Sequence, residues 1–418
     1  MKNMGRSLRR SRKTGLHTTL FVVLSTSAAA NTRWHVDASS PPGQDGLGWS
    51  SAFHTTDEAL TQAHFGDEIW VKAGRYFPST LTDSNDPRTA SLSIPVGVSF
   101  YGGFNGTEAT LAQRAGLYDQ TILSGDLGLS GDSSDNAYHV VKAVFLGGTP
   151  AKPTILDGFT IRDGNANAPG HSGGGGVYMF NAGLLMSNCT LRDNMAVHGA
   201  GLHAQPALAY VSWCKFVDNH ASGNGGAIWG RAINFKLSHS TLHGNTADKG
   251  GALHFSSIFD DSAGHLPVVL VHNSLLHDNS ASEGGGASWA SSGAPIPSRL
   301  SYYNSIVWHN SAPLDPNFAG RNLVYASNIE NGVHYGSRNI SPPPHFRNGP
   351  GRDLRLASNA PSIDSGADAL VPPDFLDLNE NGVWQEAQAF DLDHNPRFTS
   401  ELNTPGVPHI VNMGAYEY

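Results

Sequence analysis

A short motif recurs along residues 174–310, and its regular spacing constrains the fold more than any other feature of the chain. One half of the motif is a glycine-rich start before an apolar residue, at Gly174, Gly199, Gly225, Gly250 and Gly285. The other half is an asparagine three positions after an apolar residue, at Asn194, Asn219, Asn245, Asn279 and Asn310. The glycine starts lie 25, 26, 25 and 35 residues apart, and the asparagines 25, 26, 34 and 31. A repeat of this length predicts a solenoid, whose units pack against their neighbours.

The pattern inside each repeat is that of a β-strand. Cys189 and Leu191 fall on one face of their segment, and Cys214 and Phe216 fall on the same face one repeat later. Apolar residues at every second position indicate a strand. Because the register recurs in each repeat, we expect strands to stack on their own copies as a parallel β-helix, with coils about 4.8 Å apart. The asparagines should form a ladder of amides from coil to coil.

The repeats resemble those of a known family of bacterial proteins. The segments Phe216-Val217-Asp218-Asn219 and Gly225-Gly226-Ala227-Ile228 look like the FxxN and GGAI repeats of polymorphic outer-membrane proteins, which belong to the right-handed parallel β-helices similar to pectate lyases. This resemblance implies an all-β fold, a single-stranded right-handed parallel β-helix (solenoid) with an N-terminal cap and an irregular C-terminal module. The same fold carries lyases, hydrolases, adhesins and passive surface proteins, so it implies no single activity.

The C-terminal residues resemble a second conserved region. Residues 353–356, 361–366 and 412–417 are similar to the choice-of-anchor Q region found at the ends of secreted bacterial β-helix proteins. That region has Asp before Met-Gly-Ala-Tyr-Glu and Gly within Asp-Leu-Asp-Gly-Asn-Pro-Arg, whereas this chain has Asn412 and His394 at those positions.

The N-terminus has the pattern of a secretory signal peptide. Six basic residues and no acidic ones precede an apolar run that ends in Ala28-Ala29-Ala30. We expect cleavage after Ala30, no later transmembrane segment, and a place outside a bacterial cell or on its outer surface. The domain boundaries that we expect are listed in chain order: a signal peptide over 1–30, an N-terminal cap and first coils over 31–95, the right-handed β-helix over 96–340 and the C-terminal module over 341–418.

Two further segments carry local predictions. Residues 56–63 have the pattern of a short amphipathic helix that would cover the open end of the solenoid, ahead of a first strand within residues 66–71. The longer spacing after His254 predicts a loop around Asp260–Gly264.

The charge of the mature chain limits its partners. Removal of residues 1–30 takes six of the 26 Lys and Arg residues and none of the 35 Asp and Glu residues, which leaves a formal net charge of −15. This charge argues against nucleic acid or anionic lipid as a partner. A polysaccharide or cell-surface glycan is the partner that we expect. Cys189 and Cys214, one coil apart, could form a disulfide, but two buried free thiols are favoured.

An outward aromatic ladder is the first candidate ligand site. It takes one residue from each glycine motif: Tyr178, His203, Trp229, His254 and Trp289. Each follows a position that should point inward, so each should face out. Flat rings in a row could stack sugar rings. The alternative is that the rings stack on one another and stiffen the sheet without a ligand.

Carboxylates supply the other candidates. Asp193, Asp218 and Asp278 share one register, interrupted by Gly244, and are either the acid and base of a glycosidase or solvated corner residues. A lyase would need a basic residue, and the nearby ones are Arg192, Lys215, Arg231 and Lys236.

A calcium site is predicted near the C-terminus, with two Asx turns as the alternative. Its candidate ligands are Asp377, Asn379, Asn381, Asp391, Asp393 and Asn395; this calcium would be structural, and position twelve of the loop is Gln388 rather than the expected Glu. The 20 histidines show no zinc-binding spacing, so no zinc site is expected. The function that these features favour is a secreted or surface protein that binds glycans. The alternatives are a polysaccharide lyase or glycoside hydrolase and a passive structural protein.

Overall fold

The computed structural model describes most of the chain after the predicted signal peptide. The described residues are 31–144, 154–205, 207–231, 233–256, 268–290, 299–320, 322–332, 335–349, 352–373, 390–397 and 411–418. From Thr32 to Tyr418 the chain forms one compact unit. The predicted signal peptide and the predicted loop around Asp260–Gly264 lie outside the described residues.

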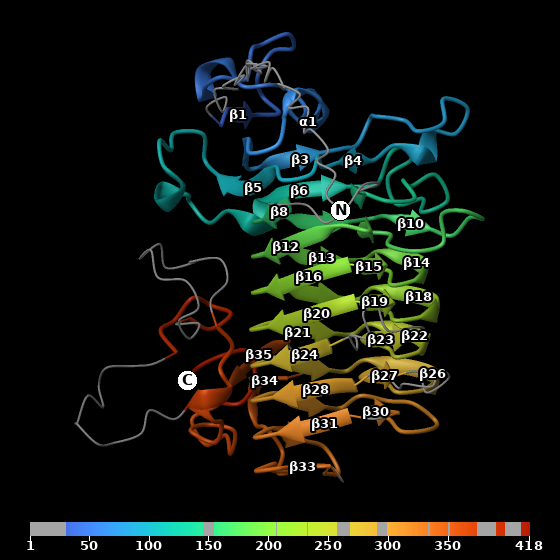
Figure 1. Cartoon of the computed structure of the whole chain (residues 1–418), viewed down its shortest axis with the longest axis vertical. Coiled ribbons are helices and arrows are strands. Elements are labelled where there is room, and N and C mark those ends of the chain that lie inside the picture. Colours follow the sequence, from blue (N-terminus) through green and yellow to red (C-terminus); the bar gives the residue numbers. More distant parts are fainter. Residues whose placement is uncertain are drawn as a thin grey trace, which may run out of the picture. The chain divides into compact units, whose positions relative to one another are not determined.

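The chain winds as a right-handed parallel β-helix (Figure 1). The repeats predict the parallel β-helix, and the family resemblance implies its right hand. Each regular coil visits four sheets, here named A, B, C and D. The coil that starts at β11 continues through β12, β13 and β14 before β15 stacks on β11. Every strand pair in these four sheets is parallel, because each strand pairs with the equivalent strand of the next coil.

Four sheets therefore run along the coils. Sheet A contains β1 (Arg33–Val36), β2 (Glu68–Lys72), β5 (Ser99–Phe104), β8 (Thr154–Asp157), β12 (Gly183–Ser187), β16 (Ala207–Ser212), β20 (Ile233–Ser238), β24 (Val268–His272), β28 (Arg299–Tyr303), β31 (Asn322–Tyr325) and β33 (Gly336–Ser337). Sheet B contains β3 (Gly74–Tyr76), β6 (Thr121–Ser124), β9 (Thr160–Arg162), β13 (Thr190–Arg192), β17 (Lys215–Val217), β21 (Thr241–His243), β25 (Leu275–His277), β29 (Ile306–Trp308) and β32 (Asn328–Ile329). Sheet C contains β4 (Leu92–Ser93), β7 (Val141–Val144), β11 (Val177–Phe180), β15 (Leu202–Gln205), β19 (Ile228–Arg231), β23 (Leu253–Ser256), β27 (Ser288–Ala290) and β30 (Phe318–Ala319). Sheet D contains β10 (Asn165–Ala166), β14 (Met195–His198), β18 (His220–Asn224), β22 (Thr246–Lys249) and β26 (Ser280–Gly284).

The asparagine ladder lies at the corner between sheets B and D, and its amides bond from coil to coil as predicted. The side-chain amide of Asn219 donates to Asn245 Oδ1 at 2.9 Å, and that of Asn245 donates to Asn279 Oδ1 at 2.9 Å. The left-handed residue of this corner is the one before each asparagine, such as Asp218 with φ 53°. The asparagine itself is not in the left-handed conformation, although this residue type tolerates it. The asparagine instead points into the coil, where it satisfies buried backbone groups.

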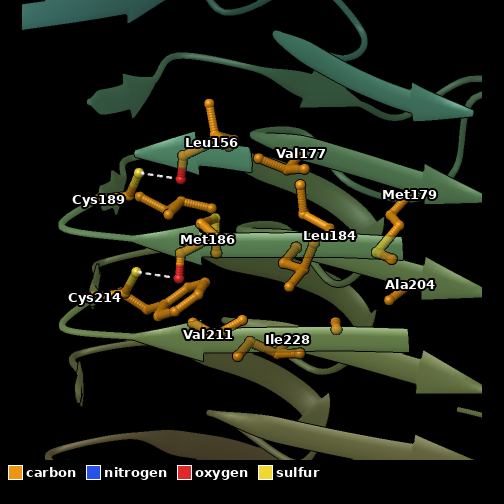
Figure 2. Packing of buried hydrophobic residues seen from close by; sticks show 14 of the residues in the cluster. Leu156, Val177, Met179, Leu184, Met186, Cys189, Ala204, Val211, Cys214 and Ile228 are labelled. Carbon is orange, nitrogen blue, oxygen red and sulfur yellow. Dashed lines mark hydrogen bonds between the residues drawn. The ribbon is translucent and has the colours of Figure 1, made fainter. Parts of the chain in front are cut away.

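The interior of the coils is filled by apolar side chains from sheets A, B and C, while alanines of sheet D form a small cluster of their own. Figure 2 shows Leu156, Met186 and Val211 of sheet A pointing into this core. Cys189 and Cys214 are buried free thiols, in agreement with the favoured alternative. Their sulfur atoms lie near backbone carbonyl oxygens of the preceding coil, 3.6 Å from Leu156 and 3.8 Å from Met186 (Figure 2).

The N-terminal end is covered by a short helix, α1 (Thr56–Gln62), close to its predicted place. Its start is fixed by a capping box between Thr55 and Glu58, and its apolar face joins the core. The first strand is β1 (Figure 1), which precedes α1 in the chain. It pairs with β2. The prediction that the first strand follows the helix is therefore wrong, because Arg33–Val36 already pairs with β2 at the edge of sheet A. Five single-turn 3-10 helices complete the described elements: η1 (Trp49–Ser51), η2 (Pro87–Thr89), η3 (Leu111–Gln113), η4 (Tyr118–Gln120) and η5 (Asp368–Leu370).

The C-terminal segment, which is the described part of residues 341–418, packs on the outside of the coils. It contains the antiparallel pair β34 (Phe346–Asn348) and β35 (Asp353–Leu356). Its side chains Leu354, Leu356 and Met413 form a second apolar cluster with Ile306 and Trp308 of β29. The backbone N–H of Gly414 donates to the Asn304 carbonyl at 2.7 Å, which ties the chain end to the corner between sheets A and B.

Candidate functional site

The aromatic ladder lies on sheet C in the predicted register. Tyr178 pairs with His203, His203 with Trp229, Trp229 with His254 and His254 with Trp289. The rings stack along the coils: the His203 centroid lies 5.4 Å from Tyr178 and 4.4 Å from Trp229, with interplanar angles near 20°. The ring faces therefore meet each other, which is the arrangement of the alternative without a ligand.

The ladder residues point away from the core but are covered. His203, Trp229 and His254 are only 7%, 8% and 5% exposed. Chain that leaves sheet D lies over them: the His198 ring stacks on Trp229 at 5.9 Å, and a Cβ on Gly173 would come within 2.1 Å of His203 Nδ1. The expectation of solvent-facing rings was wrong for these three, because the glycines beside sheet D allow its chain to approach the ladder closely. Burial lowers the pKa of His203 to about 4 and that of His254 to about 3.

The ends of the ladder are less covered. Tyr178 and Trp289 are half-buried. The Lys249 ammonium lies 5.4 Å from the Trp289 ring centroid, a distance typical of a cation–π contact.

The acidic register runs along the corner between sheets B and D. Asp193, Asp218 and Asp278 occupy its left-handed position, with φ of 55°, 53° and 53°. Asp163 continues the same register one coil earlier, because Arg162 pairs with Arg192. Gly244 interrupts the row, since a Cβ there would lie 2.3 Å from Asp218 Oδ1.

Cations neutralise most of this row. Arg192 Nε lies 2.8 Å from Asp193, and Arg162 lies 2.8 Å from Asp163 and 3.5 Å from Asp193. Both oxygens of Asp218 accept hydrogen bonds from Arg352, which comes from the C-terminal segment. Stacked carboxylates are therefore compatible with folding, because a guanidinium lies beside each of these three.

A polar pocket of about 280 Å³ opens at the first coils of this register. It is lined by Arg75, Asp126, Ser130, Gly131, Ser133, Asn136, Arg162, Asp163, Gly164, Asp193 and Met195. Arg75 of β3 lies 3.1 Å from Asp126 and 3.6 Å from Asp163. One oxygen of Asp126 is buried without a hydrogen-bond partner among the described residues. The pocket therefore offers guanidinium donors and carboxylate acceptors side by side.

Sequence reasoning missed most of this pocket. Arg75 and Asp126 belong to irregular coils outside the repeated motif, and only the stacking of β3 and β6 under β9 brings them to Asp163. The available signal was the position of Arg162, which matches Arg192 in the repeat.

The basic residues considered for lyase chemistry do not converge. Arg192 and Lys215 lie on sheet B, Arg231 on sheet C and Lys236 on sheet A. Arg192 is paired with Asp193, and the Lys236 ammonium lies 5.0 Å from the Tyr210 ring centroid.

The predicted calcium ligands are described only in part, since Asp377, Asn379 and Asn381 lie outside the described residues. Asp391 is buried, and each of its oxygens already accepts N–H donors: Asp393 N at 2.9 Å and Asn395 N at 2.7 Å on one, Glu417 N at 2.8 Å on the other. The first of these bonds is an Asx turn, the alternative to calcium. Asp393 and Asn395 are exposed. The calcium site stays a prediction.

The two departures from the choice-of-anchor Q pattern have structural roles. Asn412 Oδ1 accepts the backbone N–H of Asp364 at 2.8 Å, a bond that a carboxylate would also make. His394 has φ 61°, where glycine is the least strained residue, and its Nε2 lies 3.0 Å from Asn188 Oδ1 on the β-helix. Nearby, buried Arg397 pairs with Glu417, and burial raises the pKa of that carboxyl group to about 7.

Imidazoles surround the last carboxylate of the acidic register. His277 Nδ1 lies 2.9 Å from Asp278 Oδ2, and His309 Nδ1 lies 3.8 Å from Asp278 Oδ1. His243 occupies the position of His277 one coil earlier. Burial lowers the pKa of His243, and it lowers that of His277 to about 4.

Comparisons with known proteins bear on the fold and the repeat. Residues 214–231 match the Chlamydia polymorphic membrane protein repeat, a stretch that contains both motifs quoted above. No curated protein sequence matches the chain significantly. No helix among the described residues has the length and apolar character to cross a membrane.

Three solved structures are similar in fold. A rhamnogalacturonan lyase covers 76% of this chain and 91% of its own, with a TM-score of 0.43 and 10% identity. A pectin methylesterase mutant solved with a hexasaccharide covers 75% of this chain and 94% of its own, with a TM-score of 0.37 and 12% identity. A pectate lyase covers 94% of this chain and 98% of its own, with a TM-score of 0.35 and 11% identity. The chain is a parallel β-helix that carries repeats of the polymorphic membrane protein type.

Proposed function

We propose that this protein lies on the outer surface of a bacterium and binds glycans there without cleaving them. The glycan would be bound in the polar pocket beside Asp163 and Asp193. The observation that carries the proposal is the balance of charge in and around that pocket. Three guanidinium groups, of Arg75, Arg162 and Arg192, face three carboxylates, of Asp126, Asp163 and Asp193. Charged donors and acceptors at one place can bind vicinal hydroxyl groups.

The same balance favours a neutral glycan over a polyuronate. Each guanidinium already has a carboxylate partner, so an incoming uronate would have to displace that partner. A hydroxyl group can both donate to a carboxylate and accept from a guanidinium without breaking the ion pairs.

The surroundings of the carboxylates favour binding over hydrolysis. The general acid of a glycosidase is a carboxyl group that an apolar surrounding keeps protonated. The carboxylates of this pocket lie beside arginines instead. The outer-surface location is supported by the predicted signal peptide and by the match to a membrane protein repeat.

The test is a binding and cleavage assay on the mature protein from Asn31. Co-sedimentation with plant, algal and microbial polysaccharides, new reducing ends and ultraviolet absorbance of unsaturated uronate would be followed in parallel. We expect retention by a neutral polysaccharide and no new ends. Asp193→Asn should weaken retention at least about tenfold, since a hydrogen bond to a charged group contributes about 1.5–3 kcal/mol.

Asp353→Asn is the matched control. Like Asp193, Asp353 is paired with arginine, Arg355 at 2.7 Å, but it lies on β35 and does not line the pocket. Equal effects of the two variants, or the release of new ends, would contradict the proposal.

A further inference from the structure

Two histidines from consecutive coils meet on sheet B beside the acidic register. His243 ends β21, His277 ends β25, and the two are paired in the sheet. Both lie outside the core yet are only 6% and 2% exposed. Their cover is the C-terminal segment, since the Phe346 ring meets His277 edge-on at 5.1 Å.

The hydrogen bonding of His243 leaves one nitrogen available. Its Nδ1 lies 3.4 Å from the carbonyl oxygen of His277, and a carbonyl can only accept, so Nδ1 carries the proton. Nε2 is then the nitrogen with a lone pair. It is buried and has no hydrogen-bond partner among the described residues. A metal-binding imidazole is oriented in the same way, by a bond from its other nitrogen to a carbonyl.

Asp278 completes a set of three ligands. One ligand atom from each of His243, His277 and Asp278 lies within 4.8 Å of the others. Small side-chain rotations would bring three such atoms to the bond length of about 2.0–2.2 Å that zinc makes with nitrogen and oxygen. The side chain of Asp278 is 45% exposed, which gives an ion a path from solvent.

The charge at this place also differs from that of the other carboxylates. Asp163, Asp193 and Asp218 each have an arginine within 4.0 Å, whereas the groups at that distance from Asp278 in the described part of the chain are imidazoles. The Arg352 guanidinium on the same face is held by both oxygens of Asp218. The Arg352 charge acts on Asp278 only from a distance, so a divalent cation would supply the direct cationic partner that the other three carboxylates have.

We propose that His243, His277 and Asp278 bind one divalent transition-metal ion of the zinc type. Two imidazoles and one carboxylate suit such an ion better than Ca²⁺ or Mg²⁺, which prefer oxygen ligands. The ion joins two adjacent coils beneath the C-terminal segment. His309 on the following coil, with Nδ1 3.8 Å from Asp278, is placed to supply a fourth ligand.

The expectation of no zinc site rested on the spacing of histidines within one segment. Here the histidines come from different coils, and the stacking of those coils brings them together. His277 follows His243 by 34 positions, which is one turn of the solenoid, as for Asn245 and Asn279. The signal in the sequence was a histidine directly after the inward leucine in two consecutive repeats, Leu242-His243 and Leu276-His277.

The experiment uses untagged mature protein, dialysed against a chelator and titrated with Zn²⁺, Co²⁺ and Ca²⁺ by calorimetry. We expect one Zn²⁺ per chain, binding at least 100-fold tighter than Ca²⁺, and a visible absorption band with Co²⁺. Asp278→Asn and His243→Ala should each weaken Zn²⁺ binding at least tenfold. Asp278→Asn changes a half-exposed side chain, so it reports on the site even if His243→Ala fails to fold.

His220→Ala is the control for adventitious binding, because His220 is an exposed histidine of sheet D whose Nδ1 contacts Thr246. It should leave the affinity unchanged. The proposal is overturned if no stoichiometric ion binds, if Ca²⁺ binds as tightly as Zn²⁺, or if Asp278→Asn binds Zn²⁺ like the parent protein. Glycan retention by the pocket beside Asp193 is measured separately, so either proposal can fail alone.

Discussion

The asparagine ladder makes a quantitative prediction about stability, which Asn245→Ala tests. Asn245 is fully buried, and its Oδ1 accepts both the backbone N–H of Asn219 at 3.1 Å and its side-chain amide at 2.9 Å. Its own amide donates to Asn279 at 2.9 Å and to the Phe216 carbonyl at 3.0 Å. One side chain therefore serves three coils.

The cost of the substitution follows from which groups lose their partner. The backbone N–H of Asn219 loses its acceptor, and an unpaired buried donor costs about 1–3 kcal/mol. The Asn219 amide keeps a bond to Leu191 O at 2.9 Å, so it loses one bond of two. Two further bonds are lost between groups that keep another partner, one to the Asn219 amide and one to Asn279 Oδ1, which still accepts the backbone N–H of residue 245 at 3.1 Å. At about 1 kcal/mol for each of these two bonds, the free energy of unfolding should fall by about 3–5 kcal/mol in total.

Urea unfolding followed by tryptophan fluorescence measures this loss. Asn85→Ala is the control, because Asn85 is an exposed loop residue whose amide contacts Asp83 at 3.3 Å, and it should change the free energy of unfolding by less than about 0.5 kcal/mol. If Asn245→Ala were as stable as the control, the ladder would not stabilise the coils and the reasoning would be refuted.

Three other predictions follow from buried side chains. Trp229→Ala should lower the free energy of unfolding by about 3–5 kcal/mol and leave glycan retention unchanged; lost retention at unchanged stability would make the ladder the binding site. Burial lowers the pKa of His203 from 6.5 to about 4, so as the pH falls the unfolded chain takes up a proton first. The urea midpoint should therefore fall between about pH 6.5 and 4, and His203→Phe, which keeps an aromatic ring in the ladder, should reduce that fall; an equal fall in the variant would contradict the assignment. Cys189 and Cys214 should both resist alkylation in the native protein and both react in urea, as counted by mass spectrometry, because they are buried and burial raises the pKa of the Cys214 thiol. Labelling of either thiol without denaturant would show that the coil opens there.

The features that could be predicted from the sequence are those that repeat. The parallel β-helix, the asparagine ladder and the register of Asp193 and Asp218 follow from a spacing that each coil copies. The cap helix could be predicted because Thr55 and Glu58 fix its start locally.

The features that could not be predicted depend on chain that is distant in sequence. The chain that covers Trp229 comes from the neighbouring sheet D. Glycines allow it to approach the ladder closely, and the sequence alone does not show that a ring lies against them. Arg75 reaches Asp163 across irregular coils of unequal length, and Arg352 reaches Asp218 from the C-terminal segment. Local patterns carry no information about such contacts. Stacking brings residues of different coils together, and the sequence shows which residues meet only where the period of the repeat is known.

The corners of the coils differ in how much their length varies, and this has a consequence for how such a chain can evolve. Two residues separate the strands at every corner from sheet A to sheet B between β8 and β32, and two at each corner from sheet B to sheet D between β9 and β26. From sheet C to sheet A the separation is 2 residues between β11 and β12, 11 between β23 and β24, and 8 between β27 and β28. The hydrogen bond from the side-chain amide of Asn245 to Asn279 is nevertheless 2.9 Å long, the same as the equivalent bond from Asn219 to Asn245 one coil earlier. Insertions and deletions can therefore accumulate along the edge between sheets C and A without a shift in register. Relatives of this chain should diverge in length there, while the corners from sheet A to sheet B and from sheet B to sheet D stay constant.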